Sequence, residues 1–433
     1  MALLKSMRIS TEVPELDIRQ RAEPAEIRIA RSIAEIEALR ECWSNWPGHR
    51  DSDIDFYLMI LNSYPDVVRP HVVVLYRDGE PESILIGRLE KKHIAFNIGY
   101  LRLPRVRARC LTFVYGAIHG KNSAENIKLL VHSILDSLDN EEADLAFLEF
   151  VPLGSSLYGL ALNLPGVFGR DILPSVQAHH LLAVPQRIED VYCQMSAKHR
   201  KNLRREIKHL LGGTAKARIV CFRDECELGR LFQDAEAIAR TTYQRGLGTG
   251  FADNALIRKR LELGARKGWL RAHLLYISDR PVAFWIGMLY NHTFISEYLG
   301  YDPEFRRLSP GMVLIMKVIE DFSGQTDGGL VTELDFGLGD AEYKAALCSK
   351  TWLEAPVHIF SSTPRGLLLK FLRLMTRTAD VCARKVLTST NMLPKLRRIW
   401  RDRLSRHEQH QQLPGEAEIV AVAPSEVPPS VAN

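Results

Sequence analysis

Several short stretches of the chain alternate hydrophobic and polar residues with the period of two that is typical of a half-buried strand. The clearest is 294–299, Phe-Ile-Ser-Glu-Tyr-Leu. Between these stretches, apolar residues recur at intervals of three and four, which is the spacing of an amphipathic helix. The pattern predicts strands at 27–30, 71–76, 83–89, 110–115, 144–150, 179–184, 269–277, 281–290, 294–299, 331–336 and 356–360. We therefore expect a mixed α/β protein in which helices flank the strands.

The strand at 294–299 leads into a turn and then a helix. Pro303 ends the strand, because proline lacks the N–H donor that a strand ladder needs. One apolar face indicates the helix, formed by Met312, Ile315, Met316, Ile319 and Phe322. Ser309 can cap its start, Pro310 suits the first helical position, and Gly311 leaves the backbone open there. A helix start with unpaired N–H groups and a positive dipole end is a ready phosphate site.

The segment 306–311, Arg-Arg-Leu-Ser-Pro-Gly, resembles the acyl-CoA site of the GNAT superfamily of N-acyltransferases. The usual pattern there is Arg/Gln-x-x-Gly-x-Gly/Ala, and Ser309 stands in place of its first glycine. The flanking motifs resemble the CelD-type branch, the cellulose-biosynthesis-associated acetyltransferases, which is related to the Fem-type peptidyltransferases. These motifs are Tyr298…Tyr301-Asp302-Pro303, Leu308-Ser309-Pro310-Gly311, Asp335-Phe336-Gly337…Gly339…Tyr343-Lys344 and the basic run 196–205. The similarity extends from about residue 196 to residue 350.

The resemblance implies a meander of strands, and this layout occurs twice along the chain. Residues 175–362 would form a catalytic GNAT module and residues 26–165 a second, GNAT-like module. Each should be a mixed, mostly antiparallel sheet flanked by helices. Where the phosphate turn belongs, the first module has Gly-Ala-Ile-His-Gly-Lys-Asn-Ser at 116–123, without Arg-x-x-Gly-x-Gly. We therefore expect a degenerate, non-catalytic module that helps to wall a cleft; a working second site is the alternative.

The resemblance also implies the donor, acetyl-CoA or another acyl-CoA, with no metal. Its pyrophosphate would bind the backbone amides at the start of the 312–322 helix. Its pantetheine arm would enter where the strands at 293–299 and 331–336 splay apart. Backbone N–H groups at 298–300 would polarise the thioester carbonyl. The residues expected to hold the donor are Tyr298, Leu299, Arg306, Arg307, Ser309, Gly311 and Met312.

Acyl transfer to an amine or hydroxyl requires a base for the nucleophile's proton and a proton for the leaving thiolate. Glu297 is the nearest carboxylate, but neighbouring strand residues point to opposite faces, so only one of Glu297 and Tyr298 can face the cleft. Asp335, at the carboxyl end of the next strand, is the first candidate for binding or deprotonating the acceptor. It could equally cap the turn before Gly337. Tyr343 occupies roughly the position at which many GNAT enzymes keep a tyrosine near the sulfur, so it is either the general acid or a core residue.

Four basic residues are candidates for substrate binding. Lys198 and Arg204 belong to a predicted basic helix, which either meets phosphate or sugar-phosphate groups or is simply solvated. Arg245 lies in the glycine-rich loop 244–250; in GNAT folds this loop borders the acceptor pocket, so it is either a lid or a plain connector. Lys344 would bind a phosphate of the donor or the acceptor.

Composition adds the expected compartment. The chain has 433 residues, 46% of them hydrophobic and 25% charged, which fits two or three domains of an ordinary soluble protein. No apolar run is long enough to span a bilayer, and the first residues lack the apolar core of a signal peptide. The seven cysteines are scattered without a Cys-x-x-Cys pair, as expected for reduced thiols in a cytoplasm. His179-His180 lies in a strand without a plausible set of metal ligands and is expected to be structural.

The formal net charge of +5 conceals a basic segment near the C-terminus. Residues 363–407 contain 12 Lys and Arg against 2 Asp and Glu, a net charge of +10, which leaves the rest of the chain near −5. Apolar residues interleave with these cations, as in basic amphipathic helices. Such helices either lie on an anionic membrane surface, here the inner face, or pack on a neighbouring domain, and we favour packing. Residues 1–25 are expected to be flexible and 408–433 disordered.

These observations predict a cytoplasmic GNAT-type acyltransferase. By resemblance, it would acylate an amine or hydroxyl of a sugar, polysaccharide or envelope precursor, as in exopolysaccharide or cellulose biosynthesis. One alternative is a Fem-like transferase that takes an aminoacyl group from tRNA, which the basic helix would serve. Another is a catalytically silent partner that docks a polysaccharide synthase at the membrane through residues 364–406. A chain-wide affinity for nucleic acid is not expected, because the basic charge is local.

Overall fold

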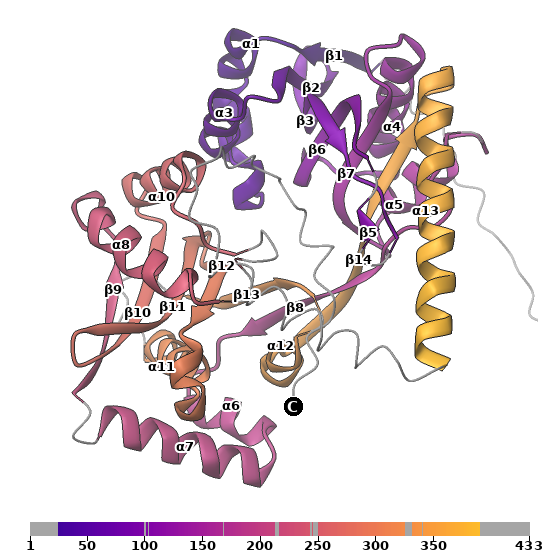
Figure 1. Ribbon diagram of the computed structural model, residues 1–433. Helices are drawn as coiled ribbons and strands as arrows, with labels where there is room; N and C mark the ends of the chain where they lie inside the picture. Colours follow the sequence, from indigo (N-terminus) through magenta and orange to yellow (C-terminus); the bar gives the residue numbers. More distant parts are fainter. Residues whose placement is uncertain are drawn as a thin grey trace, which may run out of the picture.

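A 12-stranded sheet forms the framework of the molecule. The computed structural model describes residues 25–98, 101–102, 104–167, 169–212, 216–242, 245, 250–324, 331–339 and 341–389 (Figure 1). From one edge to the other the strands are β1 (Glu26–Ala30), β2 (Val67–Arg77), β3 (Glu80–Ile94), β6 (Val106–Gly120), β7 (Leu145–Pro152), β14 (Lys350–Phe360), β8 (Gln177–Ala183), β13 (Glu333–Leu338), β12 (Thr293–Tyr301), β11 (Arg280–Tyr290), β10 (Leu270–Ile277) and β9 (Ala217–Phe222). A separate ribbon pairs β4 (Asn97–Ile98) with β5 (Leu101–Arg102). Every predicted strand is present, and the mixed, mostly antiparallel α/β fold is confirmed; β9 was not predicted.

Helices connect most of the strands. They are α1 (Ile33–Ala38), α2 (Arg40–Asn45), α3 (Ile54–Ser63), α4 (Ala124–Asp139), α5 (Ser156–Asn163), α6 (Ile188–Gln194), α7 (Ala197–Leu211), α8 (Leu228–Ala239), α10 (Ala255–Arg266), α11 (Pro310–Ser323), α12 (Glu342–Leu347) and α13 (Pro364–Ser389). Short 3-10 turns are η1 (Arg50–Ser52), η2 (Glu225–Glu227) and η3 (Pro303–Leu308). The predicted basic amphipathic helix is thus present as α13. The expectations for 1–24 and 390–433 lie outside the described residues.

The two halves of the chain exchange their last strands. Each half contains an antiparallel meander that ends in one parallel pair, β6 with β7 and β12 with β13. β8 follows the first half in sequence but pairs with β13 of the second, whereas β14 follows the second half and pairs with β7 of the first. β8 and β14 then pair with each other. With the proposed bounds 26–165 and 175–362, β8 belongs to the second module, and β14 of that module pairs with β7 and so completes the first module's part of the sheet.

Helices cover both faces of the second half of the sheet. Along β11, successive side chains point to opposite faces, as the pleat requires. Trp285 joins the apolar cluster under α6, α7 and α11, whereas Phe284 and Ile286 join the cluster under α8 and α10. β11 is therefore buried on both faces. The site described below lies where this half of the sheet meets the first.

Two local predictions are wrong. Residues 116–123 do not form a turn throughout, because β6 continues to Gly120. Ser309 occupies the cap position of α11, yet its side chain accepts no hydrogen bond from the described residues of the helix. Its backbone is left-handed, with φ of 47°, instead of the extended conformation that lets a serine side chain reach back.

Candidate active site

The donor side of the candidate site begins where β12 and β13 separate. These strands pair in parallel only over Thr293–Ile295 and Glu333–Asp335. Beyond this point β12 stays paired with β11, and β13 continues along β8. The predicted splaying between the two strands is therefore present.

A bulge follows directly in β12. The register between β12 and β11 skips Glu297, which is the extra residue. Because of the bulge, the side chains of Glu297 and Tyr298 do not point to opposite faces of the sheet as expected. Arg260 of α10 lies within reach of both, 3.4 Å from Glu297 Oε1 and 3.5 Å from the Tyr298 hydroxyl. The prediction that Glu297 and Tyr298 face opposite sides is therefore wrong. Tyr298 completes this corner by packing its ring edge-on against Phe251, with 5.7 Å between centroids.

Glu297 is held between two arginines. Arg50 of η1, in the first half of the chain, forms an ion pair with it, and each of these two side chains is only 4% exposed. Arg260 approaches the same carboxylate oxygen. Neighbouring positive charges stabilise the ionised form of a carboxylate and make it a poor base. This geometry favours a role for Glu297 in joining the halves over a role as the general base.

The first turn of α11 is open. The side chain of its cap residue, Ser309, accepts no hydrogen bond from it. Pro310 has no N–H group, so the first amides of the helix are those of Gly311 and Met312. A Cβ on Gly311 would lie 3.3 Å from the Tyr301 ring, so the glycine keeps this turn close to the end of β12. The amides and the positive end of the helix dipole together suit an anionic group.

The corresponding helix of the first half, α4, begins differently. Ser123 caps it by accepting a hydrogen bond from the Asn126 N–H at 3.1 Å. By contrast, α11 is preceded by two exposed cations, Arg306 and Arg307, on η3. Of these two helices, α11 has the start that suits a phosphate.

A buried polar network surrounds Asp335 at the junction of the halves. His179 Nε2 lies 2.7 Å from Asp335 Oδ1, and its Nδ1 lies 3.3 Å from Glu354 Oε2. Tyr115 and Trp352 both donate hydrogen bonds to Glu354, at 2.9 Å and 2.6 Å. The Trp352 ring stacks on that of His179, with 4.3 Å between centroids. These residues come from β6, β8, β13 and β14, so the network requires both halves.

The two carboxylates keep His179 protonated. Burial favours the neutral imidazole, but the hydrogen bonds and charges of Asp335 and Glu354 outweigh it and raise the pKa of His179 to about 9. Burial likewise opposes ionisation of Asp335, yet the bond from His179 outweighs it and lowers the pKa of Asp335. Asp335 also accepts a hydrogen bond from the Gly337 N–H at 2.6 Å. Asp335 therefore caps the turn before Gly337, and its pairing with an imidazolium makes it a weak base.

The η1 turn links this network to the β12 bulge. The His49 ring packs edge-on against Tyr115, with 4.7 Å between centroids, and its Nδ1 lies 3.5 Å from a carboxylate oxygen of Asp51. Asp51 binds Arg50, the partner of Glu297. Burial favours the neutral carboxyl, but the charges of Arg50 and His49 outweigh it and lower the pKa of Asp51 to about 2. The side chains of His49 and Asp51 are 21% and 28% exposed, so solvent reaches the network through them.

Other predicted site residues are held by local contacts. Tyr343 is half-buried and edge-on to Phe336, with 6.0 Å between centroids, which favours the core residue over the general acid. Lys344 donates a hydrogen bond to a backbone carbonyl at the end of β13 at 2.7 Å. Leu299 and Met312 pack against the same apolar cluster as α11.

The remaining basic candidates are dispersed. Lys198 is exposed on α7, and Arg204 of the same helix lies over the Tyr192 ring, 4.7 Å from its centroid. In Figure 1, α7 lies beyond α11 as seen from α10 and α3, so these residues are not brought to the polar network. Arg245 pairs with Glu236 at 3.0 Å. Most of the predicted lid around Arg245 lies outside the described residues.

Sequence reasoning missed several members of the network. They are His49, Arg50, Asp51, Tyr115, Trp352 and Glu354. They are ordinary polar or aromatic residues, and the contacts that join 49–51, Tyr115 and 352–354 to one another and to His179 connect distant parts of the chain. His179 offered the one usable signal, because a histidine inside a buried strand needs polar partners. Within the described residues, no group of three or more His, Cys, Asp or Glu is arranged to hold a metal ion.

The second half of the chain carries an acetyltransferase (GNAT) domain: residues 197–345 match that family. The match confirms the GNAT resemblance for residues 197–345; it does not distinguish the CelD-type branch. No relative of significant sequence similarity occurs among the curated proteins.

The chain is similar to several solved structures, of which FemX supports the fold. FemX is 10% identical, with 80% of this chain and 100% of that chain covered and a TM-score of 0.52. A tandem GNAT protein from the clavulanic acid biosynthesis pathway is 10% identical over 78% of this chain and 99% of its own, with a TM-score of 0.43. L-PGS from Bacillus licheniformis is 12% identical over 80% and 96%, with a TM-score of 0.44. The similarity to FemX extends over both halves of the chain and concerns the fold alone.

Proposed function

We propose that the protein transfers an acyl group, in the simplest case acetyl, from acyl-CoA to an amine or hydroxyl of a saccharide precursor. The observation that carries the donor assignment is the open start of α11 directly after the point where β12 and β13 separate. The pyrophosphate would bind the Gly311 and Met312 amides, with Arg306 and Arg307 supplying positive charge. The pantetheine arm would lie between the two strands and bring the thioester to the bulge.

The transfer forms a bond between the acceptor nitrogen or oxygen and the acyl carbon, and breaks the carbon–sulfur bond. The acceptor loses one proton and the departing thiolate gains one. Backbone N–H groups of β12 near its bulge would stabilise the oxyanion. The exposed edge of the polar network, His49 and Asp51, would receive the acceptor, and a carboxylate there suits a protonated amine. The first half thus contributes to acceptor binding, although we propose no second donor site in it.

The acceptor class follows from resemblance. The CelD-type and Fem-type similarity of the motifs between 196 and 350 supports a sugar, polysaccharide or envelope precursor, as in exopolysaccharide or cellulose synthesis. Transfer of radiolabelled acetyl groups to a panel of amino sugars and nucleotide sugars would identify it. Labelling of none of these, with labelling of protein or polyamine acceptors instead, would contradict this part of the proposal.

Calorimetric titration with acetyl-CoA tests the donor site. The double variant Arg306→Glu/Arg307→Glu should weaken binding by about tenfold or more, because two favourable contacts with phosphate become repulsive. Both side chains are exposed, so the fold should be retained. Lys128→Glu/Lys259→Glu, at exposed positions on α4 and α10, makes the same change in net charge and should bind like the wild type. Equal affinity in the two variants would refute the assignment of the donor site.

A second candidate donor is aminoacyl-tRNA, favoured by one observation. The side of α7 that faces solvent is basic, with Lys198, Lys201, Arg204, Arg205 and Lys208 exposed. Charge reversal at Lys201 and Arg205 should abolish transfer if tRNA is the donor, and should leave acetyl transfer unchanged if acyl-CoA is. Absence of acetyl-CoA binding together with dependence on charged tRNA would establish this alternative.

A further inference from the structure

Helix α13 has one packed face and one exposed apolar face. Leu369, only 1% exposed, packs with Phe360 of β14 in a small cluster that also contains strands of the first half. On the opposite side, large apolar side chains face solvent: Leu367 (37% exposed), Leu368 (51%), Phe371 (56%) and Met375 (47%). They recur at the spacing of one helical face. Packing on a neighbouring unit, which the sequence favoured, therefore accounts for only one side of α13.

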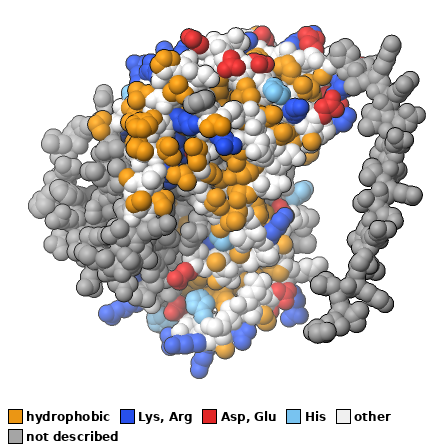
Figure 2. Space-filling model, turned by 90° about the vertical axis from the view of Figure 1, so that its right-hand side faces the viewer, with side chains coloured by type: hydrophobic (Ala, Val, Ile, Leu, Met, Phe, Trp, Pro, Cys, Tyr) orange, Lys and Arg blue, Asp and Glu red, His pale blue; other side chains and the backbone are white. Residues whose placement is uncertain are grey.

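A neighbouring loop enlarges the apolar face. Val167, Ile172 and Leu173 are 62%, 51% and 36% exposed. Two basic residues of α13 hold this loop: Lys370 donates to the backbone carbonyl of Val167, and Arg373 pairs with Asp171 at 2.9 Å. Figure 2 shows the result as a broad band of hydrophobic side chains interrupted by Lys and Arg on this side of the molecule. A contiguous exposed apolar area of this kind marks an interaction surface.

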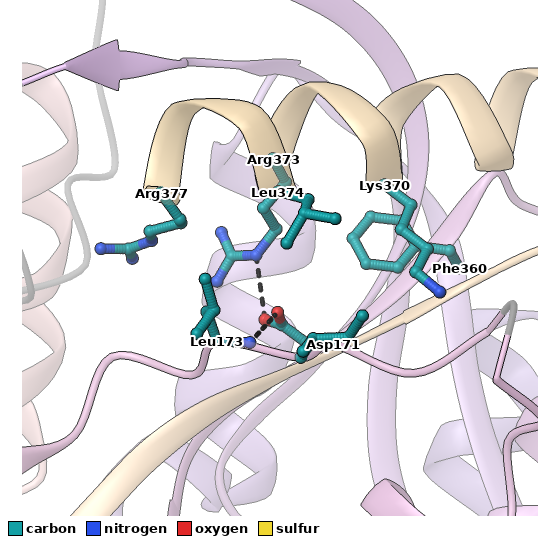
Figure 3. Close-up of a pocket in the computed structure, with 8 residues that line it drawn as sticks. Asp171, Leu173, Phe360, Lys370, Arg373, Leu374 and Arg377 are labelled. Carbon is teal, nitrogen blue, oxygen red and sulfur yellow. Dashed lines mark hydrogen bonds and ion pairs between the residues drawn. The ribbon is translucent and has the colours of Figure 1, made fainter. Parts of the chain in front are cut away.

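Positive charge gathers at the border of that surface. A shallow pocket between α13 and the loop is lined by Lys370, Arg373 and Arg377, with Asp171 at its floor (Figure 3). Asp171 is already paired with Arg373, and within the described part of the chain the buried Nη2 of Arg373 has no hydrogen-bond partner. The described lining of the pocket thus carries three cations and one carboxylate, a net positive charge that suits an anion.

We propose that α13 and the neighbouring loop residues 167 and 169–173 dock on the surface of an anionic phospholipid bilayer. Leu368 and Phe371 would enter the boundary between headgroups and acyl chains, and the pocket would receive a lipid phosphate. A bilayer accounts for both features at once, because it presents apolar chains beneath a layer of negative charge. The charge of the surrounding sequence also has the sign that an anionic bilayer attracts, since residues 363–407 carry a net charge of +10. No helix within the described residues is long and apolar enough to cross a membrane, so the contact would be peripheral.

Co-sedimentation of the full chain with vesicles tests the proposal. The chain should bind vesicles of phosphatidylcholine containing about one third phosphatidylglycerol, and should bind pure phosphatidylcholine vesicles at least tenfold more weakly. Leu368→Asp/Phe371→Asp should reduce binding to the anionic vesicles by roughly tenfold or more, and Lys370→Glu/Arg377→Glu by a similar factor. The matched controls are Ile33→Asp/Val68→Asp, at apolar positions 46% and 47% exposed, and Lys128→Glu/Lys259→Glu. Both controls should bind like the wild type.

Three outcomes would overturn the proposal. Undiminished binding of both α13 variants would show that another basic segment makes the contact. If the pocket bound inorganic phosphate and the chain did not bind vesicles, the pocket would be a site for a free anion and not for a lipid phosphate. A wild-type dimer that Leu368→Asp/Phe371→Asp converts to a monomer, again without vesicle binding, would assign the surface to a second copy of the chain. Circular dichroism and acetyl-CoA binding of each variant would establish that it is folded, because α13 lies apart from α11 (Figure 1).

Discussion

The imidazole of His179 lies between two carboxylates, and its charge ties the halves together. With Asp335 on one side and Glu354 on the other, it bridges β13 and β14 through β8. Neither carboxylate would be tolerated in this buried position without a cation. His179 is thus a structural support for the residues that we propose contact the acceptor.

The charge of His179 makes stability depend on pH. Its pKa is about 9 in the folded protein and about 6.5 in an unfolded chain, so its stabilising effect is complete below pH 6.5 and disappears as the pH rises through 9. The free energy of unfolding of the wild type, relative to His179→Gln, should fall by up to about 3 kcal/mol over this range. Urea denaturation at several pH values measures it. His132→Gln, at an exposed position on α4, should show no such dependence; a pH-independent difference for His179→Gln would contradict the charged state.

Glu297 provides the second test at this scale. Replacement by Gln removes one of the two carboxylates that pair with the buried Arg50 and leaves Asp51 as the other, so the free energy of unfolding should fall by about 3 kcal/mol. Glu41→Gln, at an exposed position on α2, should change it little. Denaturant titration compares them. If Glu297→Gln instead abolished transfer while stability stayed at the wild-type value, Glu297 would be the catalytic base after all.

At the scale of elements, the turn between η3 and α11 depends on one left-handed residue. Ser309 has φ of 47° and ψ of 45°, which is a conformation that glycine adopts without cost. This explains why the GNAT pattern has glycine at that position. A non-glycine residue there is strained by about 1 kcal/mol.

Ser309→Gly should therefore raise the free energy of unfolding by roughly 1 kcal/mol. Binding of acetyl-CoA should be retained, since the proposed contacts are made by backbone amides. Ser309→Ala keeps the Cβ and the strain, so it should give no gain. A stability of Ser309→Gly equal to that of Ser309→Ala would show that the turn is not strained.

The elements were largely predictable because their signals are local. Period-two alternation marked β12, and a single apolar face marked α11. The bulge at Glu297 was not predictable, because it arises from the pairing of β12 with β11 and leaves the alternating pattern of the sequence intact. The same applies to the polar network: Tyr115 and Glu354 become neighbours only through the sheet order β6-β7-β14. The residues of the proposed donor site are continuous in sequence and could therefore be named from it, whereas those of the proposed acceptor side, apart from Asp335, could not.

At the scale of the whole molecule, the exchange of β8 and β14 makes the two halves one folding unit. Deleting residues 350–433 removes β14 and should unfold the first half, because β7 loses its partner along Glu354–Phe360. Deleting only 390–433 leaves every described element in place and should preserve the fold. Calorimetry and limited proteolysis compare the two deletions with the full chain, which should melt in one transition. A protease-resistant first half in the larger deletion would contradict this dependence.

Strand exchange also constrains how such a protein can change over evolutionary time. A break in the gene between the codons for 165 and 175 would give two products. The N-terminal product would lack β14, the partner of β7, and the C-terminal product would contain β14 without β7 to pair with. Neither product could recombine with an unrelated domain and still fold unless it acquired a strand to replace the missing partner. The first half is therefore inherited together with the half that carries the GNAT match, whether or not it has chemistry of its own.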